Sequence, residues 1–253
     1  MTATHAQGRL YLVGVGPGDP ELMTVKAVRV LEQAPVWITP KARENGASHA
    51  LHIAAAHVGT ENKEVLELRF PMKKIRLGEQ VDGEVARAWS AAAGAVRTHL
   101  EQGRDVAFPT LGDPALYSTA FYLLDTLQGQ NPDLQVTIVP GITAMSACSA
   151  RIRAPLGLGD DVVTIVPAAF DDHRLRGILA ANDAVVLMKV FRRMDRLVPL
   201  LDELGLLAHA VLIERCGMDD QRIYTDLRQA QGRRLHYFST ILIRRKPVAA
   251  RTA

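Results

Sequence analysis

Short apolar segments alternate with longer amphipathic segments along almost the whole chain. Residues 10–15 predict a buried strand, residues 21–33 predict the helix after it, and residues 79–100 repeat apolar side chains every three or four positions, which is typical of an amphipathic helix. Strands that alternate with helices in this way indicate an α/β protein in which helices cover a parallel sheet. The 253 residues leave room for one or two such domains.

The two halves of the chain differ in how closely the predicted strands follow one another. In the first half, further strands are expected at 36–39, 64–70, 106–109 and 135–139, separated by helices at 48–58, 114–127 and 142–151. In the second half, strands are expected at 162–166, 184–188, 210–214, 222–225 and 237–244, with one helix at 194–204. Because this spacing leaves room for fewer helices, we predict a mostly parallel wound sheet followed by a mixed-sheet α/β domain, with domains at 1–115 and 116–253.

Composition excludes several classes of protein. The two cysteines, Cys148 and Cys216, form no Cys-x-x-Cys motif, so neither a disulfide framework nor a thiolate metal site is expected. The histidines do not have the close spacing of metal ligands, so no histidine metal site is expected either.

No apolar run approaches the roughly 20 residues that cross a bilayer, and the chain starts without a secretion signal, which predicts a cytoplasmic protein with no membrane contact. The net charge of +3 is a mild excess that does not indicate a nucleic-acid binder and suits an acidic small molecule.

A glycine-rich loop, Gly14-Val15-Gly16-Pro17-Gly18-Asp19-Pro20, follows the first predicted strand. Glycines let a backbone turn tightly and approach a ligand that a Cβ would repel. The dinucleotide fingerprint Gly-x-Gly-x-x-Gly requires a third glycine where this chain has Asp19. Asp19 is placed to cap the next helix, so a carboxylate would occupy the helix N-terminus where a phosphate would otherwise bind. The loop therefore disfavours a phosphate-bearing cofactor.

Two further turns share features with this loop. Leu111-Gly112-Asp113-Pro114 follows the strand at 106–109, and Pro140-Gly141-Ile142-Thr143 follows the strand at 135–139. Each turn alone is most simply a helix start or a chain reversal. Ligands of open α/β sheets gather at the carboxyl ends of the strands, so the three turns together are expected to face one crevice.

The run of residues 13–27 resembles the opening signature of the tetrapyrrole (corrin/porphyrin) methylases. Further segments are similar to the branch of that family that methylates carbon 20 of precorrin-2: Phe70-Pro71-Met72, Leu111-Gly112-Asp113-Pro114, Tyr117-Ser118-Thr119, Val139-Pro140-Gly141-Ile142, Leu187-Met188-Lys189 and Tyr237-Phe238-Ser239. The resemblance covers about residues 9–245, and the ordered set of motifs is more specific than any one of them. It implies transfer of a methyl group from S-adenosylmethionine to carbon 20 of precorrin-2, giving precorrin-3A, in cobalamin biosynthesis.

The resemblance also implies a two-domain α/β enzyme, usually a homodimer, that folds S-adenosylmethionine into the cleft between its domains. Carried over by motif, the cofactor contacts would be Pro17, Leu111, Gly112, Asp113, Leu116, Ser118, Thr119, Thr143, Ala144, Met188, the 214–216 segment with Cys216, and Thr240. The residue chemistry agrees, because this cofactor has no phosphate and its cationic sulfonium and ammonium suit an acidic turn such as the one at Asp113.

Methyl transfer from a sulfonium is an in-line displacement that needs no metal, so the enzyme has to orient the reacting carbon in a dry complex. A proton must also leave the tetrapyrrole, and the candidates for handling it are Asp113, Tyr117, Lys189 and Glu214. The candidates for binding the substrate carboxylates are Lys41, Arg43, Arg151, Arg192 and the basic stretch at 73–76.

Several alternatives stay open. The substrate could already hold cobalt, as cobalt-factor II does, or be another tetrapyrrole, although Leu111 argues against the uroporphyrinogen branch, which carries glycine there. A nicotinamide oxidoreductase would need the missing third glycine and an acidic residue where Pro40 and Lys41 stand. A non-catalytic S-adenosylmethionine-binding module would share the pocket. A methylase that acts on RNA or protein would share the fold, and the modest charge disfavours RNA.

Overall fold

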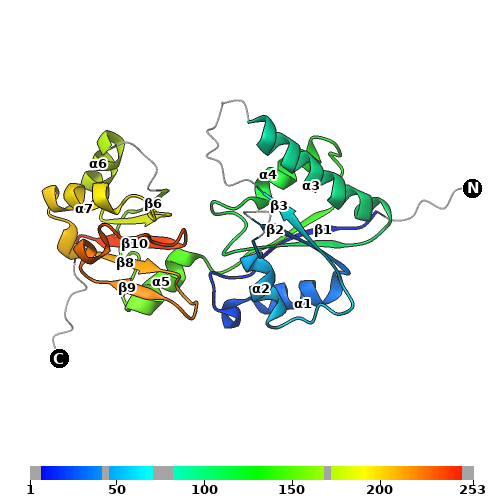
Figure 1. The fold of residues 1–253 in the computed structure, drawn as a ribbon, viewed down its shortest axis with the longest axis horizontal. Helices are drawn as coiled ribbons and strands as arrows, with labels where there is room; N and C mark the ends of the chain where they lie inside the picture. Colours follow the sequence, from blue (N-terminus) through cyan, green and yellow to red (C-terminus); the bar gives the residue numbers. More distant parts are fainter. Residues whose placement is uncertain (1–6, 42–45, 71–81, 168–171, 247–253) are drawn as a thin grey trace, which may run out of the picture. The chain divides into compact units, whose positions relative to one another are not determined.

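Two separate sheets organise the chain, and each carries its own helices (Figure 1). The computed structural model describes residues 7–41, 46–70, 82–167 and 172–246. The chain divides into two units, residues 1–143 and residues 144–253. The α/β architecture predicted from the sequence, a parallel sheet followed by a mixed one, is confirmed.

The first unit is built on a parallel five-stranded sheet in the order β3-β2-β4-β1-β5. Its strands are β1 (Leu10–Gly14), β2 (Val36–Lys41), β3 (Glu64–Arg69), β4 (Val106–Thr110) and β5 (Val136–Val139). Leu10 of β1 lies beside Val106 on one side and beside Val136 on the other. Strands that are covered on both faces need apolar side chains at successive positions, which explains why β1 and β4 are almost entirely apolar and buried.

Helices cover both faces of this first sheet. They are α1 (Val25–Gln33) and α2 (His49–Ala55) on one face, and α3 (Gly83–Glu101) and α4 (Ala120–Gln128) on the other. Leu10 and Leu12 of β1 pack with α3 and α4, whereas Val13 packs with α1 and α2, because successive side chains of a strand point to opposite faces. Since β1, β4 and β5 run parallel, their carboxyl ends meet at one edge of the sheet.

The second unit holds a mixed sheet in the order β6-β7-β10-β8-β9. Its strands are β6 (Val163–Pro167), β7 (Ala184–Met188), β8 (Ala210–Glu214), β9 (Arg222–Tyr224) and β10 (Ser239–Arg244). Strands β6 and β7 run parallel, and β10 runs antiparallel to both β7 and β8. Helices α6 (Asp172–Ala181) and α7 (Met194–Glu203) pack on one face, and α5 (Ala144–Ile152) contacts β10. Short 3-10 helices are η1 (Pro20–Leu22) in the first unit, and η2 (Leu207–His209) and η3 (Leu227–Ala230) in the second.

The first predicted helix, at 21–33, is divided in the structure. Asp19 caps only the 3-10 turn η1, and Thr24 then starts α1 by accepting a hydrogen bond from the Ala27 N–H at 3.1 Å. Each cap accepts a hydrogen bond from a backbone N–H in the first turn, which has no carbonyl partner within the helix. Asp19 therefore caps the element after the glycine loop as predicted, but the predicted length of that element is wrong.

Helix α4 and the division between the units also lie later in the chain than predicted. The helix expected at 114–127 begins at Ala120, whose N–H donates to Ser118 Oγ at 3.1 Å. The division follows Thr143 rather than residue 115, because β5 pairs with β1 and so belongs to the first sheet. Helix α6 is absent from the sequence expectations, since a glycine interrupts its short apolar pattern.

Candidate functional site

Three turns at the carboxyl ends of β1, β4 and β5 are joined by hydrogen bonds. The Gly112 N–H donates to the Gly16 carbonyl at 2.7 Å, and the Gly16 N–H donates back to the Gly112 carbonyl at 3.3 Å. The Gly141 N–H donates to Asp113 Oδ2 at 2.8 Å. The three turns therefore lie side by side at one edge of the first sheet.

Two glycines in these turns lie where a side chain would not fit. A Cβ on Gly141 would lie 2.2 Å from the Gly112 carbonyl oxygen, and a Cβ on Gly14 would lie 2.7 Å from the same oxygen. Gly112 itself has a φ of +73°, a left-handed conformation that other residues rarely adopt. These glycines therefore allow the three turns to pack closely against one another.

Asp113 connects two of the turns. Its Oδ1 accepts the Ala115 N–H at 2.7 Å, and its Oδ2 accepts the Gly141 N–H at 2.8 Å. Each carboxylate oxygen has more than one acceptor site, so Asp113 can bind a further donor while it holds this geometry. The side chain is half-buried and places a negative charge at the strand ends, which suits a cationic ligand group.

The residues after Asp113 form turns that lead into α4. The Ser118 and Thr110 hydroxyls are 2.8 Å apart. Tyr117 has a φ of +52° and a side chain that is 44% exposed, and its partial burial raises the pKa of its hydroxyl. A left-handed backbone in a bulky residue is uncommon and is one of the features that cluster at functional positions. The backbone conformation of Tyr117 therefore strengthens its candidacy for a role in the proton transfer.

In the second unit, β7 and β8 both end beside the start of β10. Met188 at the end of β7 lies opposite Thr240, and Glu214 at the end of β8 lies opposite the first residue of β10. The residues that follow, Lys189 and Arg215, have φ values of +62° and +53°. Candidate residues from three strands are thus brought to one edge of the second sheet.

The thiols of Cys148 and Cys216 are hydrogen-bonded to each other in the second unit. Cys148 belongs to α5 and Cys216 follows β8, and both are buried. Their hydrogen bond raises the pKa of Cys148 and lowers that of Cys216; burial adds to the first shift and opposes the second. Cys148 is also hydrogen-bonded to Thr240. Two expected cofactor residues, Cys216 and Thr240, are therefore joined through Cys148, which the sequence patterns do not single out.

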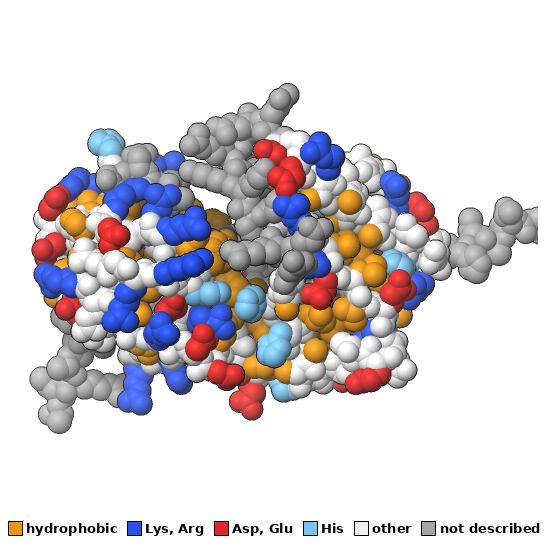
Figure 2. Space-filling model, in the orientation of Figure 1, with side chains coloured by type: hydrophobic (Ala, Val, Ile, Leu, Met, Phe, Trp, Pro, Cys, Tyr) orange, Lys and Arg blue, Asp and Glu red, His pale blue; other side chains and the backbone are white. Residues whose placement is uncertain are grey.

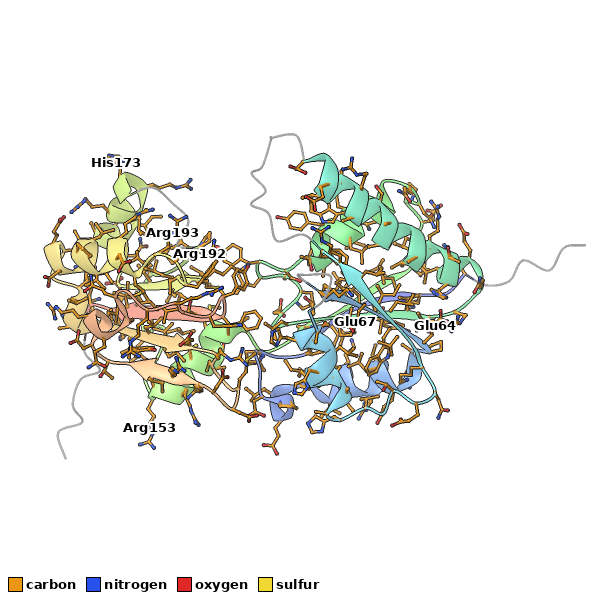
Figure 3. All side chains as sticks on the ribbon, viewed as in Figure 1. Glu64, Glu67, Arg153, His173, Arg192 and Arg193 are labelled. Atoms are coloured by element: carbon orange, nitrogen blue, oxygen red, sulfur yellow. The ribbon has the colours of Figure 1, made fainter. Side chains whose placement is uncertain are left out.

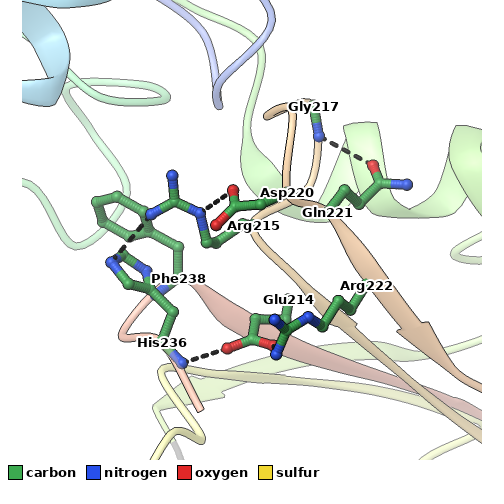
Figure 4. A network of polar contacts seen from close by, with 8 residues as sticks. All are labelled: Glu214, Arg215, Gly217, Asp220, Gln221, Arg222, His236 and Phe238. Carbon is green, nitrogen blue, oxygen red and sulfur yellow. Dashed lines mark hydrogen bonds and ion pairs between the residues drawn. The ribbon is translucent and has the colours of Figure 1, made fainter.

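Glu214 is a buried carboxylate within a polar network (Figure 4). Its Oε1 accepts a hydrogen bond from the His236 N–H, and its Oε2 lies 3.8 Å from Arg222 Nη1. Among the described residues, Oε1 is therefore hydrogen-bonded, whereas the buried Oε2 has no hydrogen-bond partner and only the charge of Arg222 near it. The bond to His236 also connects the end of β8 to the segment that precedes β10.

His236 and Arg215 are functional candidates that the sequence patterns do not indicate. His236 Nδ1 accepts the Phe238 N–H at 3.2 Å, and its Nε2 lies 3.2 Å from Arg215 Nη1 (Figure 4). Arg215 also forms an ion pair with Asp220. Burial lowers the pKa of His236 and the Arg215 charge lowers it further, so the ring is neutral at pH 7. No local motif joins these residues, because 21 positions separate Arg215 from His236.

The residues expected to bind substrate carboxylates are divided between the two units. Lys41 ends β2 in the first unit, whereas Arg151 lies in the last turn of α5 in the second. Arg192 follows β7 and has an exposed side chain (Figure 3). Arg43 and the stretch 71–76, which includes the second and third residues of the Phe-Pro-Met motif, lie outside the described residues.

The expected cofactor residues form one set in each unit. The first-unit set comprises Pro17, Leu111, Gly112, Asp113, Leu116, Ser118, Thr119 and Thr143, and the second-unit set comprises Ala144, Met188, Cys216 and Thr240. Within the ranges that the structure describes, no three His, Cys, Asp or Glu side chains are grouped so that they could hold a metal ion. Over those same ranges, no helix is both long enough and apolar enough to span a membrane.

The fold and the converging turns place the chain among α/β proteins that bind a ligand at the ends of their strands. The chain belongs to the tetrapyrrole (corrin/porphyrin) methylases, whose family model matches residues 9–231. It is 33% identical over 241 residues to the cobalt-precorrin-2 C(20)-methyltransferase of Salmonella typhimurium, which covers 94% of this chain and 97% of that protein. It is 36% identical over 241 residues to the precorrin-2 C(20)-methyltransferase of a Sinorhizobium species, which covers 93% and 95%.

Solved methyltransferase structures share this fold. The X-ray structure of the cobalt precorrin-4 methyltransferase CbiF has a TM-score of 0.69 at 22% identity and covers 93% of this chain and 94% of that one. The uroporphyrin-III C-methyltransferase of Thermus thermophilus, complexed with S-adenosylhomocysteine, has a TM-score of 0.65 at 21% identity and covers 93% and 97%. The resemblance stated from the sequence motifs is thus confirmed at the level of the family.

Proposed function

We propose that this chain transfers a methyl group from S-adenosylmethionine to carbon 20 of precorrin-2, giving precorrin-3A in cobalamin biosynthesis. The observation that carries this proposal is that two relatives named as C(20)-methyltransferases align with 93% and 94% of the chain. The geometry of the three turns is compatible with it. A phosphate-binding loop offers free backbone N–H groups to an anion, whereas these turns offer the Asp113 carboxylate, which suits a cationic cofactor without phosphate.

S-adenosylmethionine binds, in this proposal, against the three turns of the first unit. Their glycines let the turns pack closely together, and Asp113 attracts the ammonium and sulfonium groups. The carboxylate of Asp19 already accepts the Glu21 N–H at the start of η1, where a phosphate would have to compete with it. The proposed contacts are the twelve residues expected by motif, from Pro17 and Asp113 in the first unit to Met188, Cys216 and Thr240 in the second.

The reaction forms a bond between the methyl carbon and carbon 20 of the ring while the carbon–sulfur bond breaks, and S-adenosylhomocysteine leaves. Carbon 20 then loses a proton, which a nearby base accepts. Asp113 and Lys189 are the residues we propose to stabilise or move charge in this step. Tyr117 has an ordinary pKa of about 10, which burial raises further, so its hydroxyl keeps its proton at neutral pH and acts as a hydrogen-bond donor. Glu214 acts by positioning, since its carboxylate holds the His236 backbone.

The metal content of the substrate is a separate question. The Salmonella relative is named for the cobalt-containing ring and the Sinorhizobium relative for the ring without a stated metal. We propose the metal-free ring, in line with the slightly higher identity to the second relative. Parallel assays with both rings test this choice, and a much higher kcat/KM for the cobalt form would reverse it.

Calorimetry followed by a labelling assay tests the proposed function. Titration with S-adenosylmethionine should give saturable binding, and titration with NAD should give none; the opposite pattern would indicate an oxidoreductase. Incubation with enzymatically made precorrin-2 and methyl-labelled cofactor should then place one label at carbon 20. Binding without transfer would identify a non-catalytic module, and label at another carbon would identify a different tetrapyrrole methylase.

We also propose that the chain acts as a cytoplasmic homodimer, as the family resemblance implies. Size-exclusion chromatography with light scattering should give about twice the chain mass of 27.6 kDa. A mass equal to that of one chain at the concentration used for the assay would contradict this assembly.

A further inference from the structure

Four aromatic rings form a row at the edge of the second sheet where β7 and β8 end. The ring centroids are 5.3 Å apart for Phe191 and Tyr237, 5.7 Å for Tyr237 and Phe238, and 4.8 Å for Phe238 and His236. Their interplanar angles are 66°, 63° and 61°, which is the edge-to-face arrangement that aromatic rings prefer. We call these four rings the aromatic row.

Three cations lie against the aromatic row, each at a different ring. The pairs are Arg192 with Phe191 (Cζ 5.2 Å from the centroid), Lys189 with Tyr237 (Nζ 5.3 Å from the centroid) and Arg215 with His236 (Nη1 3.2 Å from Nε2). A cation within about 6 Å of a ring face is attracted by the ring. On the face shown in Figure 2, Lys and Arg side chains also gather over the second unit. The row therefore carries positive charge at Phe191 and at Tyr237, whereas the charge of Arg215 is paired with Asp220.

Backbone hydrogen bonds hold these cations at the edge. The Val190 N–H donates to the Ser239 carbonyl at 3.2 Å, and the Arg215 N–H donates to the Phe238 carbonyl at 2.7 Å. The second bond extends the pairing of β10 with β8 by one residue, and the first joins β10 to the residue two positions past the end of β7. The left-handed φ of Lys189 and of Arg215 occurs at these same two places. Strained backbone that the surrounding structure holds in place is typical of functional positions.

We infer that the aromatic row and its cations bind the carboxylates along the rim of the tetrapyrrole substrate, an inference that rests on the proposed function. A tetrapyrrole is a flat conjugated ring with carboxylates on its edge, so it needs apolar surface and cations at fixed spacings. A guanidinium over an aromatic ring keeps its N–H donors in its own plane, where they can meet a carboxylate. The contact with the ring also restricts the side chain before the substrate arrives, which lowers the entropy that binding costs.

Arg192 is the residue in which this inference is most directly tested. Its side chain is exposed, and its contact with Phe191 lies on the outer end of the row. Arg215, by comparison, is already paired with the carboxylate of Asp220, so its loss would also disturb the network around Glu214. A change at Arg192 therefore alters the charge of the row with little effect on folding.

The experiment measures KM, kcat and cofactor affinity for Arg192→Gln, Arg192→Lys and a control, Arg176→Gln. Arg176 is an exposed arginine of α6 that pairs with Glu203, so the control removes the same charge from the same unit. Arg192→Gln should raise the KM for the tetrapyrrole by about tenfold, as expected for one charged hydrogen bond, with kcat and S-adenosylmethionine affinity nearly unchanged. Arg192→Lys should recover part of the loss, and Arg176→Gln should behave as the unaltered protein.

A direct binding assay separates the failure of this inference from the failure of the proposed function. Uroporphyrin, a stable tetrapyrrole with carboxylates on its rim, is titrated into each protein; its affinity should fall most in Arg192→Gln, less in Arg192→Lys and not at all in Arg176→Gln. If the unaltered protein methylates precorrin-2 and Arg192→Gln has the same KM and the same uroporphyrin affinity, the inference is overturned and the function stands. If the unaltered protein neither methylates precorrin-2 nor binds uroporphyrin, both this inference and the proposed function are refuted.

Discussion

The candidate sites of the two units consist of different chemical groups: mainly backbone in the first unit and side chains in the second. In the first unit, the turns at the strand ends are glycine-rich, and a single carboxylate, that of Asp113, connects two of them. In the second unit, the corresponding edge carries long side chains, with Lys189 and Arg215 set by left-handed backbone. Backbone allows a ligand to approach closely, whereas side chains supply charge and flat apolar surface. In our proposals, the turns of the first unit bind the adenosyl cofactor and the aromatic row of the second unit binds the carboxylated ring.

The largest effect is expected where the first unit depends on a missing side chain. Gly141→Ala would place a Cβ 2.2 Å from the Gly112 carbonyl oxygen, so the turn has to move. We expect a loss of about 1–3 kcal/mol in the free energy of unfolding and no measurable cofactor binding. The matched control is Gly94→Ala in α3, where a Cβ would meet nothing within 4 Å. This control should stabilise the protein by about 0.5–1 kcal/mol, and urea unfolding of both variants measures the difference.

Asp113→Asn tests whether the carboxylate is needed as well as the close backbone. An asparagine has one acceptor oxygen, so its amide nitrogen would face either the Ala115 or the Gly141 N–H, and a bond of about 1.5–3 kcal/mol would be lost. Calorimetry should also show at least tenfold weaker S-adenosylmethionine binding. Asp19→Asn is the control, because Asp19 accepts the Glu21 N–H and asparagine caps helix starts as well as aspartate does. Equal cofactor binding by the two variants would contradict a special role for Asp113.

The pKa of His236 reports on the charge of the second unit's edge. Burial and the Arg215 charge lower this pKa below its ordinary value of about 6.5. The unfolded chain therefore takes up a proton at a higher pH than the folded protein does. The free energy of unfolding should fall as the pH drops from about 6.5 through the lower pKa of the folded state. Arg215→Gln removes one cause, and an NMR titration of the His236 ring should show a higher pKa. Arg228→Gln, a change at an exposed arginine that pairs with Asp202, should leave it unaltered. An unchanged pKa in Arg215→Gln would show that the two side chains are apart in solution.

A further prediction concerns an ion-pair cluster in the second unit, away from the carboxyl ends of β7 and β8. Asp161 accepts the Leu158 N–H and pairs with Arg244, and these contacts hold its pKa below the ordinary value of about 3.9. A carboxyl group with a lowered pKa stabilises the fold above its unfolded pKa, and the effect is lost as the pH falls through the folded pKa. Asp161→Asn should therefore be less stable than the unaltered protein at pH 7 and approach it below about pH 4. Urea midpoints between pH 7 and pH 3 check this, with Asp160→Asn at the exposed neighbouring position as the control.

The strands could be predicted well from the sequence, and the helix starts less well. Continuous apolar runs mark β7 and β8, and both strands have the predicted bounds, 184–188 and 210–214. Two helix starts depend instead on which of several polar residues accepts a particular N–H. Asp19 and Asp113 are plausible caps by pattern, but Thr24 starts α1 and the Ala120 N–H at the start of α4 donates to Ser118.

The candidate site of the first unit could be predicted from the sequence better than that of the second. The turns of the first unit are local, so glycine and Asp-Pro motifs indicate them directly. The contacts of the second unit arise from the antiparallel pairing of β10 with β7 and β8, which brings Tyr237 to Lys189 and His236 to Arg215. No short motif encodes such pairs, because the residues that meet are distant in the sequence.

The central claim is that the turns of the first unit bind S-adenosylmethionine through close backbone and Asp113. A crystal structure of the protein grown with S-adenosylhomocysteine tests it most directly. We predict ligand density against the Gly112 and Gly141 turns, with the ligand ammonium within hydrogen-bond distance of an acceptor in that group. Density for the ligand at a position that touches none of the three turns would contradict the claim.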